Sequence, residues 1–430
     1  MKRSLIALAA AGCMAGAGAA SAQTTLTPRA LGMGGSYVAV ARGHEALFQN
    51  PANLGLPGTP YWSVAFPQFA MGADFVGFTA GELPDLIGYG ALPQERLDQI
   101  LAGVPSTGME TTLQVRIPLA AVQVRRFALG VSYAGSWRYN LGRDVVDLML
   151  NGYEPGRTDY SVDRTGSQRA DYIDVAAAYG RQIGRVSVGA AAHYLHGRTL
   201  SQSRLFEPEF DLETDDVRVE YREVLARGGR GYALDVGAAF QPSPRITVSA
   251  AVANAFSRMT WSRELRTRHL VLDRARFENR PGMGILDRLR HSEEKVDPTA
   301  APFTVFEAAR GLYAEAYVPA VLRAGVAYAR EDGRTHVSAS YEGALTGGKL
   351  GMGWERQAGI GIEQRVPLVR LRAGAATDLE GGRMLTAGVS LNAMHLGIAH
   401  TSQPGPEGHR RTGWSATFGL GLRTTGSMRQ

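Results

Sequence analysis

Short segments in which apolar residues alternate with small or polar residues recur along most of the chain. Near the C-terminus the even-numbered residues from 414 to 422 are apolar, whereas the odd-numbered residues from 413 to 421 are Gly, Ser and Thr. The same period of two occurs in residues 127–134 and 385–392. Successive side chains of a β-strand point to opposite faces, so this pattern predicts strands with one apolar face and one small, polar face.

About fourteen such segments follow one another, and most reach the ~9–11 residues that a tilted strand needs to cross a bilayer. They cover residues 61–79, 110–124, 126–137, 170–182, 185–198, 230–241, 244–258, 321–331, 334–345, 356–365, 368–378, 382–392, 394–402 and 412–423. Short turns are expected at 183–185, 241–244, 331–333, 366–368 and 392–394. Longer connections alternate with them, at 80–109, 138–169, 199–229, 259–320, 346–355 and 403–411.

This organisation predicts an all-β fold, a transmembrane antiparallel β-barrel of about 14 strands with short turns at one end and long loops at the other. A large soluble β-sandwich would also alternate, but its outward face would carry many Lys and Glu residues. The mean hydropathy of −0.14 resembles that of a soluble protein. A low mean hydropathy does not exclude a membrane barrel, because only one face of each strand meets lipid.

The first residues have the form of a secretory signal peptide, expected over 1–22. Lys2 and Arg3 precede the apolar run 5–11, and the small residues 20–22 offer a cleavage site. The alternative, a lipoprotein signal ending at Cys13, lacks the Leu expected three residues earlier. Cys13 is the one cysteine in the sequence, so the mature chain would form no disulfide and use no thiolate chemistry. We expect export to the cell outer membrane.

Residues 23–58 do not alternate and are expected to form an N-terminal plug, or hatch, ahead of a barrel over 59–430. Gly32, Gly34 and Gly35 permit unusual dihedral angles and close backbone approach. A short helix is expected from Ser36 through Leu47, with Pro51 ending it. A compact segment of this kind can fold into a lumen that would otherwise be filled with water.

The sequence of this segment resembles a known family. LeuGlyMetGlyGly at 31–35, ValAlaValAlaArgGly at 38–43 and Asn50, Pro51 and Ala52 are similar to the N-terminal hatch of the FadL/TodX outer-membrane transporters of fatty acids and hydrocarbons, and PorV-like relatives share the pattern. The resemblance implies a fourteen-stranded barrel that takes up hydrophobic small molecules past the hatch. It also implies contact with outer-membrane lipid and lipopolysaccharide. The alternative is that the same residues pack a permanent stopper.

Two long loops carry rows of charge. Acidic residues recur at every second position, at Glu207, Glu209, Asp211, Glu213 and Asp215. Arginines share one face of a second extended segment, at Arg266, Arg268, Arg274 and Arg276. Opposite charges on neighbouring strands stabilise a sheet, so we hypothesise that the two rows face each other. Divalent-cation binding by the acidic row and a simply solvated face are the alternatives.

Signals for enzyme chemistry are weak, and the sequence predicts neither catalysis nor a cofactor. Residues 343–349 match a phosphate-binding loop, but Leu350 replaces the Ser or Thr that would hold magnesium. His193 and His196 lie three apart on a strand and would point to opposite faces, as would His395 and His400, so no metal site is expected. The net charge is +6, or +4 without Lys2 and Arg3, which is too small to indicate a nucleic-acid partner.

Amphipathic patterns at 83–104 and 284–291 predict short cap helices over the long-loop end. The leading functional prediction is passive, porin-like uptake of hydrophobic compounds such as long-chain fatty acids or hydrocarbons. The alternative is a PorV-like barrel that binds partner proteins in secretion or surface attachment. Transport predicts an apolar pocket between hatch and cap loops, whereas partner binding predicts a sealed lumen and an exposed apolar rim.

Overall fold

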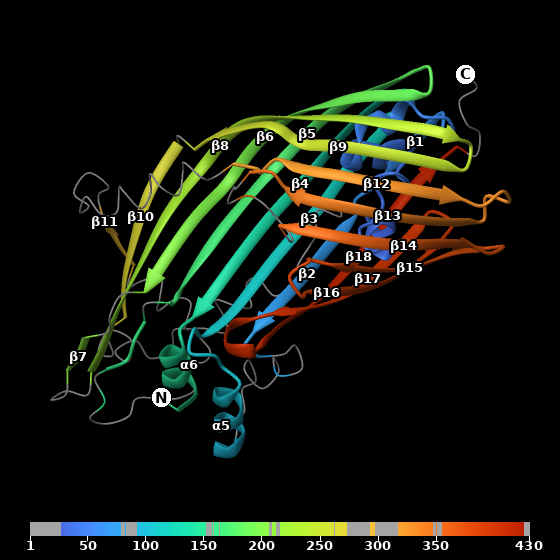
Figure 1. Cartoon of the computed structure of the whole chain (residues 1–430). Coiled ribbons are helices and arrows are strands. Elements are labelled where there is room, and N and C mark those ends of the chain that lie inside the picture. Colours follow the sequence, from blue (N-terminus) through green and yellow to red (C-terminus); the bar gives the residue numbers. More distant parts are fainter. Residues whose placement is uncertain are drawn as a thin grey trace.

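The strands close into a single antiparallel meander in which each strand pairs with the next along the chain (Figure 1). The computed structural model describes residues 27–78, 82, 93–151, 157, 159–162, 164–205, 209–211, 216–261, 263–272, 293–296, 317–346, 350 and 355–424, with the backbone alone over most of 205–222 and 263–296. In these ranges β18 (Arg410–Arg423) pairs with β2 (Phe69–Val76), which closes the sheet.

Fourteen strands form the barrel, as the alternation predicts. The first consists of two pieces, β1 (Trp62–Ala65) and β2, because both pair with β3 (Met109–Val124) and with β18. The others are β4 (Phe127–Leu141), β5 (Gly166–Ile183), β6 (Val186–Leu205), β8 (Asp216–Ser243), β9 (Ile246–Thr260), β12 (Val321–Ala329), β13 (Thr335–Ala344), β14 (Arg356–Arg365), β15 (Val369–Thr377), β16 (Arg383–Leu391) and β17 (Met394–Pro404).

The break in the first strand corrects the continuous strand expected over 61–79. It falls at Pro67, which has no N–H to donate to the ladder. On the neighbouring strand β3 the register shifts between Pro118 and Ala120. A backbone bond from Gln68 N–H to the Pro118 carbonyl, at 2.9 Å, joins the two irregular sites. Two prolines on adjacent strands therefore interrupt the wall at one place.

The strands differ greatly in length, and strand replaces the loop expected at 199–229 over most of its described residues; within the loop expected at 259–320, residues 263–272 and 293–296 form strands. Strand β8 runs for 28 residues, far beyond what a bilayer requires. Around its outer part β7 (Glu209–Asp211) and β10 (Arg263–Leu272) pair with it, and β11 (Glu293–Val296) pairs with β10. One side of the barrel thus continues as a sheet well beyond the other at the long-loop end, toward the left of Figure 1.

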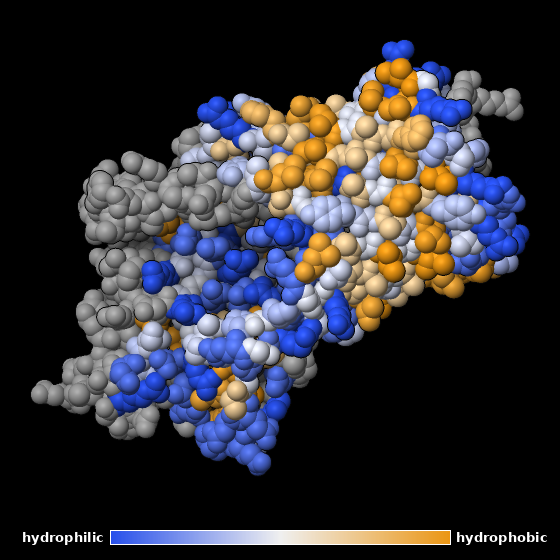
Figure 2. All heavy atoms as spheres, viewed as in Figure 1, coloured by the Kyte–Doolittle hydropathy of each residue, from blue (hydrophilic) through white to orange (hydrophobic). Residues whose placement is uncertain are grey.

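The two faces of the strands have the predicted character. Large apolar side chains point outward and are exposed, including Phe127, Leu129, Ile360, Leu385 and Trp414. The inward positions are small or polar, such as Ser132 on β4 and Thr386 on β16, and are buried. In Figure 2 the apolar side chains gather in a band across the part of the barrel where the strands are short, with hydrophilic residues on either side. Such a band is what a lipid environment requires.

One end of the barrel carries the short turns expected at 183–185, 241–244, 331–333, 366–368 and 392–394. Gly184, Gly333 and Asn392 adopt positive φ there, of 61°, 62° and 52°. Gly and Asn adopt positive φ at lower cost than other residues, so the turn positions carry suitable residues. We call this the turn end and the opposite end the loop end.

Candidate functional site: the N-terminal segment inside the barrel

The polypeptide ahead of the first strand lies inside the barrel and is almost wholly buried; residues 27–59 are here called the N-terminal segment. It contains α2 (Pro28–Gly32), η1 (Gly43–Glu45), α3 (Ala46–Gln49) and η2 (Pro51–Gly55). Its short helices are visible in blue within the ring of strands in Figure 1. Segments so short gain their stability from packing against the wall rather than from helix propensity.

The helix predicted from Ser36 through Leu47 is not formed, because the chain turns repeatedly in that region. Gly43 lies inside the predicted range and has a positive φ of 68°, which is incompatible with a continuous right-handed helix. Helix starts only at residue 43 and ends at Gln49, one residue before Asn50. Gly43, which is not among the glycines expected to adopt unusual dihedral angles, therefore interrupts the predicted helix.

Asn50 attaches the N-terminal segment to the barrel wall. Its Nδ2 donates to the Ala238 and Ala250 carbonyls and to Ser249 Oγ, at 3.1, 3.0 and 2.7 Å. Its Oδ1 accepts from the Ala52 N–H at 2.9 Å and so caps η2, in which Pro51 occupies the first position. The amide uses both its donors and its acceptor in a site where an unpaired polar group would be costly.

Glycines on the inward face of the wall receive the backbone of the segment. Gly180, Gly189 and Gly237 face the stretch from Asn50 to Gly55, and a Cβ at any of them would collide with it. A Cβ at Gly359, Gly361 or Gly374 would likewise collide with Met33 or Gly34. Gly32 lies against Gly388. The sequence predicted close approach for Gly32, Gly34 and Gly35 but missed the matching glycines on the strands.

A buried ion-pair network also joins the segment to the wall. The guanidinium nitrogens of Arg29 lie 2.7 Å from Glu45 Oε2 and 3.5 Å from Glu363 Oε2 of β14. Glu363 Oε2 also lies 2.6 Å from Arg372 Nε of β15. Tyr37 donates to Glu45 at 2.8 Å. Burial alone would raise the pKa of Glu45, but the Arg29 charge outweighs it and holds the pKa at about 2. Removing one partner would leave a buried charge uncompensated.

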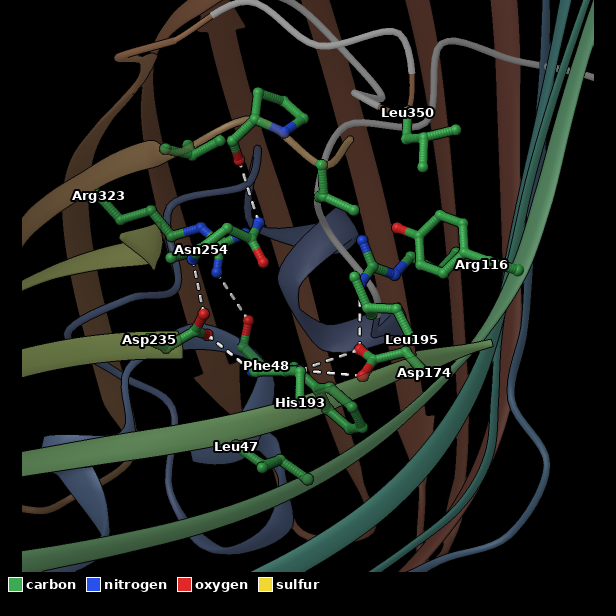
Figure 3. Close-up of a pocket in the computed structure, with 15 residues that line it drawn as sticks. Leu47, Phe48, Arg116, Asp174, His193, Leu195, Asp235, Asn254, Arg323 and Leu350 are labelled. Carbon is green, nitrogen blue, oxygen red and sulfur yellow. Dashed lines mark hydrogen bonds and ion pairs between the residues drawn. The ribbon is translucent and has the colours of Figure 1, made fainter. Parts of the chain in front are cut away.

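On the loop-end side of the segment lies a small cavity of about 50 Å³ (Figure 3). Leu47 and Phe48 of the segment form its floor, and the strands contribute both apolar and polar walls. The other lining residues are Arg116, Tyr172, Asp174, His193, Leu195, Asp235, Ala253, Asn254, Val318, Pro319, Val321, Arg323 and Leu350. A space of this size holds a water molecule or two.

Charged side chains converge on this cavity from five strands, β3, β5, β6, β8 and β12. His193 of β6 lies between two carboxylates, with Nδ1 3.0 Å from Asp174 of β5 and Nε2 3.3 Å from Asp235 of β8. Arg116 lies 3.9 Å from Asp174. Arg323 donates to the Phe48 carbonyl at 2.8 Å. As predicted, His196 does not join His193, because it is exposed on the outer face.

Above the polar groups the lumen is lined by a buried apolar cluster. Its members from the strands and the connections at the loop end are Ala134, Ala170, Tyr172, Leu195, Leu200, Ala226, Ala233, Met259, Trp261, Val318 and Leu350. Further out, α5 (Gln94–Ala102) and α6 (Arg143–Asn151) pack together through Leu97, Ile100 and Val146. Helix α5 confirms the cap helix predicted within 83–104 over residues 94–102, whereas residues 83–92 and the pattern at 284–291 lie outside the described residues.

The predicted charge rows remain a hypothesis. Strand β7, with Glu209 and Asp211, pairs with residues 216–218 of β8, and β10, with Arg266 and Arg268, pairs with residues 219–227 of the same strand. Both segments therefore pair with the outer part of β8. Glu207, Glu213, Asp215, Arg274 and Arg276 lie outside the described residues.

Within the part of the chain that the structure describes, no helix has the length and apolar character needed to span a membrane. No group of three or more His, Cys, Asp or Glu side chains in that part is arranged to hold a metal ion.

Solved structures of similar fold match nearly the whole chain. The Ralstonia pickettii toluene transporter TbuX is 17% identical, with 93% of this chain and 100% of that chain covered and a TM-score of 0.52. The monoaromatic hydrocarbon channel CymD is 14% identical over 94% and 99%, with a TM-score of 0.52. The deltaS2S3 mutant of the monoaromatic hydrocarbon channel TodX is 11% identical over 95% and 100%, with a TM-score of 0.54.

No protein-family model and no curated protein matches the sequence. At these identities the likeness concerns the fold. The chain therefore has the fold of the FadL/TodX-type hydrocarbon transporters, a closed fourteen-stranded antiparallel barrel.

Proposed function

We propose that this protein lies in the outer membrane and admits hydrophobic small molecules, with the turn end in the periplasm and the loop end outside. The observation that carries the proposal is a closed barrel with an apolar outer band, whose lumen is occupied by a separate segment of the same chain. A strand-built wall satisfies its backbone groups in lipid, and the band matches the hydrocarbon region. The solved structures of similar fold are described as toluene and monoaromatic hydrocarbon transporters or channels, which supports this reading.

In this proposal residues 1–22 direct export and residues 23–58 act as a hatch. A solute enters at the loop end and passes among the apolar side chains of α5, α6 and the apolar cluster that contains Trp261. It then reaches the cavity above Leu47 and Phe48. An apolar solute gains free energy by leaving water for such surface. The cavity of about 50 Å³ is too small for a hydrocarbon, and the N-terminal segment separates it from the turn end, so passage requires the segment to move.

A second candidate function rests on that same small volume. A PorV-like barrel that binds partner proteins in secretion or surface attachment would keep its lumen sealed, and the packed interior above the segment favours such a role. The two candidates differ in whether small molecules cross the wall at all. Uptake measurements separate them directly.

The test compares cells that lack the gene with the same cells carrying it on a plasmid. Initial uptake of labelled toluene and of a labelled long-chain fatty acid is measured, with a labelled hydrophilic sugar as the control. We expect at least one hydrophobic solute to enter several times faster when the protein is present, with sugar uptake unchanged. Equal uptake of both hydrophobic solutes, together with a secretion defect in the deletion strain, would favour the partner-binding role instead.

A further inference from the structure

A second cavity, of about 410 Å³, lies on the turn-end side of the N-terminal segment. The segment contributes Arg29, Arg42, His44 and Glu45 to its walls. The turn at 366–369, the turn at 392–393 and the end of β18 supply the rest. It is about eight times the volume of the loop-end cavity and lies where the lumen would open toward the periplasm.

Positive charge dominates the walls of this cavity. Five arginines line it, Arg29, Arg42, Arg365, Arg370 and Arg423, against the one carboxylate of Glu45. That carboxylate is already held by Arg29 and Tyr37, and Glu363 next to it is shared by Arg29, Arg370 and Arg372. Closely spaced guanidinium groups repel one another unless an anion lies among them.

Three of the arginines have no carboxylate partner among the described residues. Arg42 donates to the Ala39 and Ala41 carbonyls and to Thr247 Oγ1. Arg365 and Arg423 form no ion pair within that set of residues. Their planar donors are therefore available to an oxygen-rich anion, which guanidinium groups bind in a bidentate manner.

Two buried polar atoms of the lining residues also have no hydrogen-bond partner within the described chain. They are Arg29 Nε and His44 Nδ1, in residues that are 7% and 8% exposed. Buried polar atoms in proteins are nearly always hydrogen-bonded, so each unpaired atom needs an explanation. Both atoms belong to side chains that line the cavity, so the polar groups around it are incompletely paired within the described chain.

We propose that the turn-end cavity binds a phosphate group, held between Arg29 and Arg42 of the N-terminal segment and Arg370 and Arg423 of the wall. A phosphate dianion offers several acceptor oxygens and neutralises the excess charge. Because the phosphate contacts both the N-terminal segment and the wall, its binding holds the segment against the wall. The test below measures binding to the purified protein rather than uptake by cells, so this proposal and the transport proposal can fail independently.

Binding to the full-length mature protein in a zwitterionic detergent is measured by titration calorimetry at low salt. Inorganic phosphate, glycerol 3-phosphate and a micellar lysophosphatidate are the three probes, and they distinguish free phosphate, a soluble ester and a lipid head group. We expect saturable one-to-one binding of at least one probe. Arg423→Gln should weaken it about tenfold, because one charge-assisted contact is lost, and added salt should weaken it further.

The matched control is Arg185→Gln, which removes an exposed arginine from a turn at the same end of the barrel but outside the cavity. Heat-modifiable migration on gels establishes that both variants retain the folded barrel. Wild-type affinity in the control and loss in Arg423→Gln support the site. Absence of saturable binding of all three probes up to about 10 mM, or equal weakening by the two variants, would overturn it.

Discussion

Asn50 joins two parts of the molecule that are far apart in the sequence. Its side chain holds the start of η2 and three acceptors on β8 and β9 at the same time. The family resemblance drew attention to Asn50, Pro51 and Ala52, but their partners could not be predicted. Gly189 and Gly237 look like ordinary small residues of alternating strands, and only the fold reveals that they receive this motif.

The partners of the buried charged residues could not be predicted from the sequence either. Arg29 and Glu45 lie near each other in the sequence, but Glu363 and Arg372 belong to strands near the other end of the chain. Polar residues at inward positions are ordinary in a barrel, so nothing in their local pattern marks them as partners of the N-terminal segment. The network becomes visible only when the register of β14 and β15 is known.

At this scale we predict that Asn50→Ala loosens the N-terminal segment. The substitution removes a helix cap and leaves buried acceptors unpaired, which together destabilise the attachment by about 2–3 kcal/mol. Hydrogen exchange of the backbone amides at 46–56 should accelerate accordingly. Asn151→Ala is the control, because among the described residues Asn151 bonds to Gln94 and Asp147, both in the α5 and α6 region. Unchanged exchange in Asn50→Ala would show that the wall contacts of this residue are unimportant.

At the scale of elements, alternation predicted the strands well where the chain crosses the apolar band. The expected strand at 356–365 has the bounds of β14, and the expected short turns are all present. Prediction was less accurate toward the loop end. There Val217, Val219 and Tyr221 still alternate, but the positions between them are charged rather than small, and the ladder of hydrogen bonds between β6 and β8 continues to residues 205 and 221.

The outward position of Ile360 provides a test of the band. It lies in the middle of β14 and is 62% exposed. Ile360→Arg should lower the free energy of unfolding in phospholipid vesicles by about 2–4 kcal/mol, whereas a site near the edge of the band should lose only about 0–1 kcal/mol. Leu345→Arg at the loop end is the matched control. Urea titrations followed by tryptophan fluorescence supply the measurement, and equal losses for the two variants would place the band elsewhere.

At the scale of the whole molecule, the barrel and the N-terminal segment divide the lumen into two unlike compartments. The loop-end compartment is small and topped by an apolar cluster, whereas the turn-end compartment is larger and lined by arginines. Sequence patterning predicted a plug but not this asymmetry, because each compartment is assembled from inward residues of many strands. A transported solute would have to pass between the two, so movement of the segment is the central requirement.

That requirement is tested most directly by locking the segment to the wall. Ala52 and Ala239 belong to one buried cluster, and the one native cysteine lies at position 13 in the expected signal peptide, so Ala52→Cys with Ala239→Cys creates a single cysteine pair. Uptake of labelled hydrocarbon or fatty acid is measured before and after oxidation, with each single variant as control. We predict that the crosslinked barrel loses uptake and that a reductant restores it. Uptake at the wild-type rate by a fully crosslinked barrel would contradict the account.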